Sequence, residues 1–197
     1  MPMKKITLVV ISSLFLSGCA ALLVGGTAAT VGVVAAQERS AGQAVDDLAI
    51  MAQIKHLYLQ KNAQDLLAGV DVEVIEGRVY LTGAVNTIET RIDAVKLAWQ
   101  PKKVKEVVNE IQVSQKKSLK VIASDLRIES QLNSLLLLQK GVSSLNYSTE
   151  VVNGVVYLMG LASSKHELNT VTDLARRING VKKVISHVRL KREPARS

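Results

Sequence analysis

The chain contains one glycine-bearing motif twice, and this duplication constrains the fold more than any other feature of the sequence. The two copies, residues 74–83 and 151–160, are separated by an offset of 77 residues. Without a gap, the same offset pairs Ala98 with Ala175 and continues through residue 184. Chance does not align so many apolar and glycine positions, so the chain is a tandem repeat of one domain.

Each copy predicts a β-hairpin. Apolar residues recur at every second position before the first motif, at Val70, Val72 and Val74, as a strand with one buried face requires. Asn153-Gly154 is a strong turn signal because both central residues of a type I′ turn need φ > 0, and Glu76-Gly77 is a weaker version. Gly83 and Gly160 are expected to end the second strand, where the chain turns towards a helix.

A helix is expected on each side of the hairpin. In repeat one, Asp46 or Asp47 is the expected N-cap of the first helix, and Asn86 with Glu89 resembles a capping box for the second. The residues expected to face the core are Ile50, Ile54, Leu57 and Tyr58 in the first helix and Ile88, Ile92, Val95 and Trp99 in the second. A third strand is expected to end near Val113.

Repeat two has the same order of elements. Its first helix aligns at an offset of 78, pairing Asp47 with Asp125, so one residue is lost before the second hairpin. Ser164 with Glu167 forms a clearer capping box, and Gly180 is expected at the C′ position of the second helix. Residues 181–190 supply the last strand. Both repeats are therefore α+β units with the order helix, strand, strand, helix, strand.

The N-terminus is typical of an exported protein. Lys4 and Lys5 precede an apolar stretch, residues 6–16, that is too short to span a bilayer comfortably. Residues 16–19 then resemble the bacterial lipobox, which implies cleavage after residue 18 and lipidation of Cys19, the only cysteine. The alternative is an ordinary buried cysteine behind an uncleaved anchor. The residue after Cys19 is Ala20. In enteric-type sorting an Asp at this position retains a lipoprotein in the inner membrane, so Ala20 favours the outer membrane.

Residues 19–45 are interpreted as the lipidated N-terminus and a tether near the membrane surface. Residues 21–37 are rich in Ala, Val, Gly and Thr, and a second transmembrane helix is the competing interpretation of this segment. It is short and interrupted by glycines, which favours the tether. The sequence leaves open whether these residues are helical.

Two motifs resemble those of the BON domain family: residues 154–160 in the second hairpin and residues 180–184 before the last strand. Repeat one departs from the second motif, with Lys103 in place of its glycine. Together with the lipobox, the chain resembles the dual-BON outer-membrane lipoproteins of Gram-negative bacteria. The resemblance implies tandem BON domains, each with a three-stranded mixed sheet and two helices on one face, and binding of phospholipid rather than catalysis.

The expected domain organisation divides the chain into six segments. It comprises a signal peptide (1–18), a lipidated tether (19–45), BON domain 1 (46–113), a linker (114–123), BON domain 2 (124–192) and a tail (193–197).

Positive charge is concentrated in the second half of the chain. Residues 46–113 have 8 basic and 10 acidic side chains, and residues 124–190 have 8 basic and 5 acidic ones.

A basic domain held at a membrane attracts anionic headgroups, at about 1 kcal/mol per Lys or Arg before screening. Nucleic acid is the usual alternative partner for a pI above 9, but export and the shortage of aromatic residues argue against it. A third interpretation is that the charge only keeps the protein soluble.

The candidate lipid-binding surface lies in repeat two. Four consecutive leucines, residues 135–138, cover about 300° of a helix surface, so they cannot all face the core. Leu137 points away from the core face and is expected either on the surface or under the following loop. The candidate lipid-binding residues are Arg127, Leu137, Leu138, Lys140, Arg176, Arg177, Lys182 and Lys183. Relatives tend to have an aromatic residue where Arg127 stands, so the binding is expected to be more electrostatic.

No candidate catalytic group, metal site, cofactor or small-molecule substrate is expected. His56, His166 and His187 are far apart and match no metal-ligand or catalytic spacing. Two functional classes remain: an anionic-phospholipid-binding lipoprotein that supports envelope integrity, and a module that binds an envelope assembly factor or periplasmic clients.

Replacing Cys19 with serine removes the thiol that lipid attachment requires. We expect Cys19→Ser to leave an uncleaved precursor that incorporates no labelled fatty acid, as measured by gel mobility and palmitate labelling. Processing of this variant to the mature size at the same site would rule out the lipobox.

Overall fold

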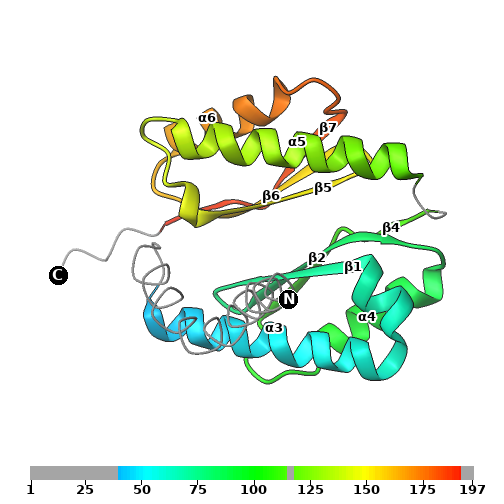
Figure 1. The fold of residues 1–197 in the computed structure, drawn as a ribbon. Coiled ribbons are helices and arrows are strands. Elements are labelled where there is room, and N and C mark those ends of the chain that lie inside the picture. The colour runs from blue at the N-terminus through cyan, green and yellow to red at the C-terminus, as the bar shows by residue number, and fades with distance from the viewer. Residues whose placement is uncertain (1–39, 115–117, 192–197) are drawn as a thin grey trace, which may run out of the picture. The chain divides into compact units, whose positions relative to one another are not determined.

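The computed structural model describes residues 40–114 and 118–191, and both repeats lie in one compact unit (Figure 1). Cys19 and the segments expected to be the signal peptide, most of the tether and the tail lie outside the described residues. Within the described ranges, no helix has the length and hydropathy needed to cross a bilayer. The same ranges contain no group of three or more metal-ligating side chains placed to hold an ion.

The two repeats have the same succession of elements. Repeat one comprises α3 (Ala41–Asn62), a π-helical turn η2 (Ala63–Leu67), β1 (Val70–Ile75), β2 (Arg78–Val85), α4 (Ile88–Ala98), β3 (Glu106–Asn109) and β4 (Gln112–Val113). Repeat two comprises α5 (Leu119–Leu138), a 3-10 turn η3 (Ser144–Asn146), β5 (Tyr147–Val152), β6 (Val155–Ala162), α6 (Lys165–Arg176), β7 (Lys183–Ser186) and β8 (Arg189–Leu190).

Each repeat is a mixed sheet with two helices on one face, which confirms the expected α+β class (Figure 1). The central strand, β2 or β6, pairs antiparallel with the first strand of its hairpin and parallel with the third. The third strand of repeat one is divided into β3 and β4, which both pair with β2. Ile111 lies at the break and is only 4% exposed, so the interruption places an apolar side chain in the core.

The strand registers of the two repeats coincide at the offset found in the sequence. Val70 lies opposite Gly83 in repeat one, and Tyr147 lies opposite Gly160 in repeat two. Since 147 − 70 and 160 − 83 are both 77, the hairpins are superimposable residue by residue. The residue lost before the second hairpin is accommodated between helix and strand, where repeat one has η2 and repeat two has η3.

A buried aspartate from the first helix holds each hairpin turn. Asp47 accepts hydrogen bonds from the backbone N–H groups of Glu76 and Gly77, both at 2.8 Å. Asp125 accepts the same pair of bonds, also at 2.8 Å, from Asn153 and Gly154.

These contacts correct the expected role of Asp47. Helix α3 begins at Ala41 with Ser40 as its N-cap, so neither Asp46 nor Asp47 is the cap. Asp47 is 2% exposed and serves the turn instead. The four turn residues have φ between 55° and 80°, which confirms the turn geometry expected from the sequence.

Gly83 and Gly160 are required inside a strand and not at its end. Both lie within β2 or β6, at φ 105° and 141°. A Cβ at Gly83 would lie 2.3 Å from the carbonyl oxygen of Gly69, and one at Gly160 would lie 2.0 Å from that of Asn146. These glycines therefore permit the chain to approach closely as it enters the first strand of the hairpin.

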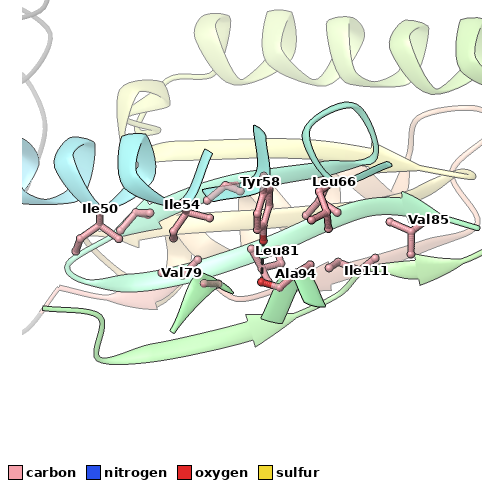
Figure 2. Packing of buried hydrophobic residues seen from close by; sticks show 13 residues of the cluster. Ile50, Ile54, Tyr58, Leu66, Val79, Leu81, Val85, Ala94 and Ile111 are labelled. Atoms are coloured by element: carbon pink, nitrogen blue, oxygen red, sulfur yellow. Dashed lines mark hydrogen bonds between the residues drawn. The ribbon is translucent and has the colours of Figure 1, made fainter. Parts of the chain in front are cut away.

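The inner face of α4 differs from the expected one. Ile88, Ile92 and Trp99 are 53%, 45% and 51% exposed, so the expectation of a core tryptophan is wrong. The buried positions are Ala94 and Ala98, whose small side chains let α4 approach the sheet and α3. The Tyr58 hydroxyl donates a hydrogen bond of 3.0 Å to the Ala94 carbonyl (Figure 2), and burial raises the pKa of that hydroxyl.

The helix caps agree with the sequence in repeat two only. Ser164 caps α6 by accepting from the Glu167 N–H, but Thr87, not Asn86, caps α4. The Glu167 carboxylate accepts from the Ser143 and Ser163 N–H groups instead of returning to Ser164. Gly180 lies beyond the C′ position, because α6 ends at Arg176.

Each repeat has its own core, and a third apolar cluster joins them. The first core contains residues of α3, α4 and the β1–β4 sheet, and the second contains their counterparts. The third cluster is formed by residues from the hairpins of both repeats: Ile75, Tyr80, Val152, Tyr157, Met159 and Leu161.

The aspartate at the turn gives a direct test of the fold. We expect Asp125→Ala to destabilise the protein by about 2–4 kcal/mol, because it removes a charged acceptor and leaves two N–H groups of the turn without it. Urea denaturation measures the change. Asp173→Ala, at an exposed site on α6, should stay within about 0.5 kcal/mol, and an equal loss from both variants would contradict the assigned role of Asp125.

Candidate functional site

The outer face of α5 carries exposed leucines along its whole length. Leu119, Leu126, Leu137 and Leu138 are 84%, 65%, 73% and 80% exposed. At about 100° per residue, Leu126 lies about 20° from Leu119, and Leu137 returns to the same direction. Three of these leucines therefore form a line along the helix. Of the two alternatives for Leu137, the structure shows the exposed one.

Cations flank this line on one side. Lys120 and Arg127 are exposed, and both lie about 80–100° around α5 from the leucine line, on the side of Leu138. The guanidinium of Arg127 donates to the Asn179 carbonyl at 2.7 Å. Arg127 is therefore fixed against the loop that follows α6, where Gly180 leaves room for it.

The other predicted cations lie around that loop. Arg176 and Arg177 end α6, and Arg176 pairs with Asp173 at 3.3 Å. Lys182 and Lys183 follow the loop, and Lys182 Nζ donates to the Asn153 carbonyl of the hairpin turn at 2.9 Å. Lys182 thus supports the turn, as Lys105 does at Glu76 in repeat one.

The structure separates the predicted site residues into two groups. Arg127 and the cations of the α6–β7 loop lie at the hairpin end of repeat two. Leu137 and Leu138 end α5 and Lys140 follows it, so this group begins ten residues, or about 15 Å, beyond Arg127 in the middle of the helix. A ligand that contacts both groups at once must therefore extend over at least about 15 Å.

A shallow groove adjoins the leucine end of α5. It is lined by Asn133, Leu137, Leu145 and Tyr147 among others, and Leu145 is itself 46% exposed. The exposed apolar surface therefore extends from the helix to η3.

The opposite flank of α5 is acidic. Burial, with Asp71 of repeat one and Asp125 nearby, raises the pKa of Glu129. Since Glu129 lies on the side of α5 away from Lys120 and Arg127, the helix presents its cations and its carboxylate in different directions.

Repeat one shares two of the four exposed leucines but not the cations. At the offset of 78, Leu126 and Leu137 correspond to Leu48 and Leu59, which are 48% and 53% exposed. Arg127 corresponds to Ala49, and Lys140 to Asn62. Repeat one instead exposes Ile88, Ile92 and Trp99 on α4, a surface that the sequence analysis assigned to the core because its spacing is that of a buried face.

The histidines do not form a common site. His56 and His166 are exposed on different repeats, and His187 shares a hydrogen bond of 2.8 Å with Glu110.

The fold and this surface define a class of protein: a tandem of two α+β domains whose described surface features are a leucine-lined helix and basic loops. The model of the BON domain matches residues 46–115 and 124–192. The chain belongs to the BON domain family.

Relatives in three bacteria resemble this chain over most of its length. A protein encoded in the gshII 5′ region of Anaplasma centrale is 44% identical over 77% of this chain and 99% of its own. Outer membrane lipoprotein DolP of Haemophilus influenzae is 32% identical over 93% of this chain and 94% of its own. The 21 kDa hemolysin of Actinobacillus pleuropneumoniae is 32% identical over 75% of each chain.

The exposure of the two terminal leucines predicts that they contribute little to stability. We expect Leu137→Asn with Leu138→Asn to change the free energy of unfolding by less than about 1 kcal/mol, whereas Leu136→Ala, at a 2% exposed position, should cost about 2–5 kcal/mol. Urea denaturation of the three proteins measures both effects. A loss from the double variant as large as that from Leu136→Ala would show that these leucines are buried.

Proposed function

We propose that this chain is a non-catalytic outer-membrane lipoprotein whose second BON domain binds anionic phospholipid and thereby supports envelope integrity. The observation that carries the proposal is the outer face of α5, where exposed leucines lie beside cations. The resemblance to an outer membrane lipoprotein over 93% of the chain supports the location. In this proposal Cys19 is lipidated and anchors the chain, with both domains facing the periplasm.

The chemistry of α5 suits a lipid surface. An amphipathic helix that lies in the headgroup region inserts its apolar side chains while its cations meet anionic headgroups. Leu119, Leu126 and Leu137 supply the apolar line, and Arg127 and Lys140 supply charge beside its middle and beyond its C-terminal end. The cations at residues 176, 177, 182 and 183 extend the basic surface at the hairpin end.

Anchoring and surface binding have different roles in this proposal. The lipids on Cys19 would keep the protein at the membrane permanently, since two or more acyl chains give stable attachment. Contact through α5 would then set the orientation of the domains. Repeat one has a net acidic composition and lacks the cations that flank α5, so an anionic surface would not attract it equally.

A second candidate function is protein binding through repeat one. The observation that favours it is the exposed row of Ile88, Ile92 and Trp99 on α4. The corresponding positions on α6 are Lys165, Asn169 and Arg176, which are polar and exposed. Repeat one thus has an apolar surface that repeat two does not have, and an envelope protein is the kind of partner proposed for it.

Charge reversal distinguishes the two repeats. We expect Arg127→Glu with Lys140→Glu to weaken binding of residues 38–197 to vesicles containing phosphatidylglycerol by at least about tenfold, because two attractive charges become repulsive. Co-sedimentation with vesicles measures the binding. The matched control, Lys55→Glu with Lys61→Glu on α3, should bind like the original protein.

Equal loss from both pairs would show that repeat two is not the lipid-binding domain. Vesicle binding that persists in high salt without repeat two would show the same. If neither pair changes the binding while Trp99→Ala abolishes association with a purified envelope partner, the second candidate function is favoured.

A further inference from the structure

The two repeats contact each other through the faces of their sheets that carry no helices. The buried residues of this contact form equivalent pairs at the offset of 77: Ile75 with Val152, and Tyr80 with Tyr157. The partly buried Val108 and Ile185 are a third such pair. Both repeats therefore use the same part of their sheet.

One polar contact joins a residue to its own equivalent. Glu110 Oε1 and His187 Nε2 are 2.8 Å apart, and 187 − 110 is 77. A residue contacts its own equivalent only if it lies close to a rotation axis that relates the two repeats, because a rotation moves residues further apart the further they lie from its axis.

Two further polar contacts show that this rotation is a half-turn. Arg189 Nη1 approaches Glu76 Oε2 at 3.3 Å, and Asn153 Nδ2 donates to Gln112 Oε1 at 2.7 Å. Asn153 is the equivalent of Glu76, and Arg189 is the equivalent of Gln112, since both differences are 77. Exchanging the repeats therefore turns one contact into the other, as in an isologous two-fold interface.

We infer that the helix-free sheet face of each repeat is a pseudo-two-fold recognition surface, with Glu110 and His187 on the axis, and that its partner is the other repeat and not a second copy of the same repeat. This inference concerns the contact between the repeats and does not depend on the proposed lipid binding.

The side chains around the axis account for the preference. Two copies of repeat one would place Glu110 against Glu110 and Glu76 against Gln112. Two copies of repeat two would place His187 against His187 and Arg189 against Asn153. Only the pairing of unlike repeats places a carboxylate opposite the guanidinium of Arg189 and opposite the imidazole of His187.

The axial pair provides the first test in the full chain. We expect Glu110→His and His187→Glu, each alone, to lower the melting temperature by about 2–4 °C, and the two together to restore most of the loss. In the original protein, the ring centroids of His187 and Tyr80 are 5.9 Å apart. In the double variant, the imidazole at position 110 should contact Tyr157, the equivalent of Tyr80, as detected by nuclear Overhauser effects.

A double variant as unstable as the sum of the singles would overturn the pseudo-two-fold relation. So would an imidazole at position 110 that contacts Tyr80. Exchange of an exposed pair away from this surface, Lys61→Asp with Asp93→Lys, is the control and should leave the Tyr80–His187 contact unchanged.

The second test concerns the choice of partner. A protease site is inserted between Ser114 and Ser118 of the full chain, and the folded protein is cut there. Mixing cut proteins with and without isotope label should yield, by native mass spectrometry, one-to-one complexes of unlike fragments that exchange between preparations. Complexes of like fragments in comparable amounts, or fragments that separate completely at micromolar concentration, would overturn the inference.

Discussion

The hydrogen bonds from a hairpin turn to a buried aspartate are the interaction on which each repeat depends. The turn needs two consecutive residues with φ > 0, and the close fit of helix against hairpin removes their N–H groups from water. Asp47 and Asp125 accept both groups in their repeats, and each bond to a charged acceptor contributes about 1.5–3 kcal/mol. The same contact sets the position of the first helix along the sheet, and thus the direction of its exposed face.

Once that scaffold is fixed, the two repeats differ mainly in what they expose. Two exposed leucines of α5, Leu126 and Leu137, have leucine counterparts on α3, but Arg127 and Lys140 stand where repeat one has Ala49 and Asn62. Conversely, α4 exposes two isoleucines and Trp99 where α6 is polar. In the proposed function, duplication followed by divergence of the surface yields one domain that binds an anionic lipid surface and another that binds an apolar partner.

The contact between the sheet faces leaves the helices of both repeats on the outside. Since the sheets meet through their bare faces, α5 and α4 remain exposed on their outer sides, and both candidate surfaces stay accessible. Glu110, His187 and the pairs around them add polar specificity to an otherwise apolar contact. A fixed relation between the repeats would make the orientation of one domain at a membrane set the orientation of the other.

The sequence alone determined the duplication, the family, the order of elements and the hairpin turns, because these follow from local propensity and from a repeat that is visible without a structure. It also determined that a run of four leucines cannot be buried entirely, since helix geometry forbids it. The candidate lipid-binding residues themselves remain a prediction: the structure shows that they are exposed and separates them into one group around Arg127 and the α6–β7 loop and another at the C-terminal end of α5.

Tertiary packing decided the features that the sequence analysis missed. Aspartate is a common N-cap residue, so the sequence suggested that role for Asp47. Only the position of the hairpin shows that its carboxylate accepts hydrogen bonds from the turn. Ile88, Ile92 and Trp99 have the spacing of a buried face, yet Ala94 and Ala98 are buried because close approach to the sheet favours small side chains. The break at Ile111 and the pairing of Glu110 with His187 likewise depend on contacts between residues distant in the chain, which local patterns do not encode.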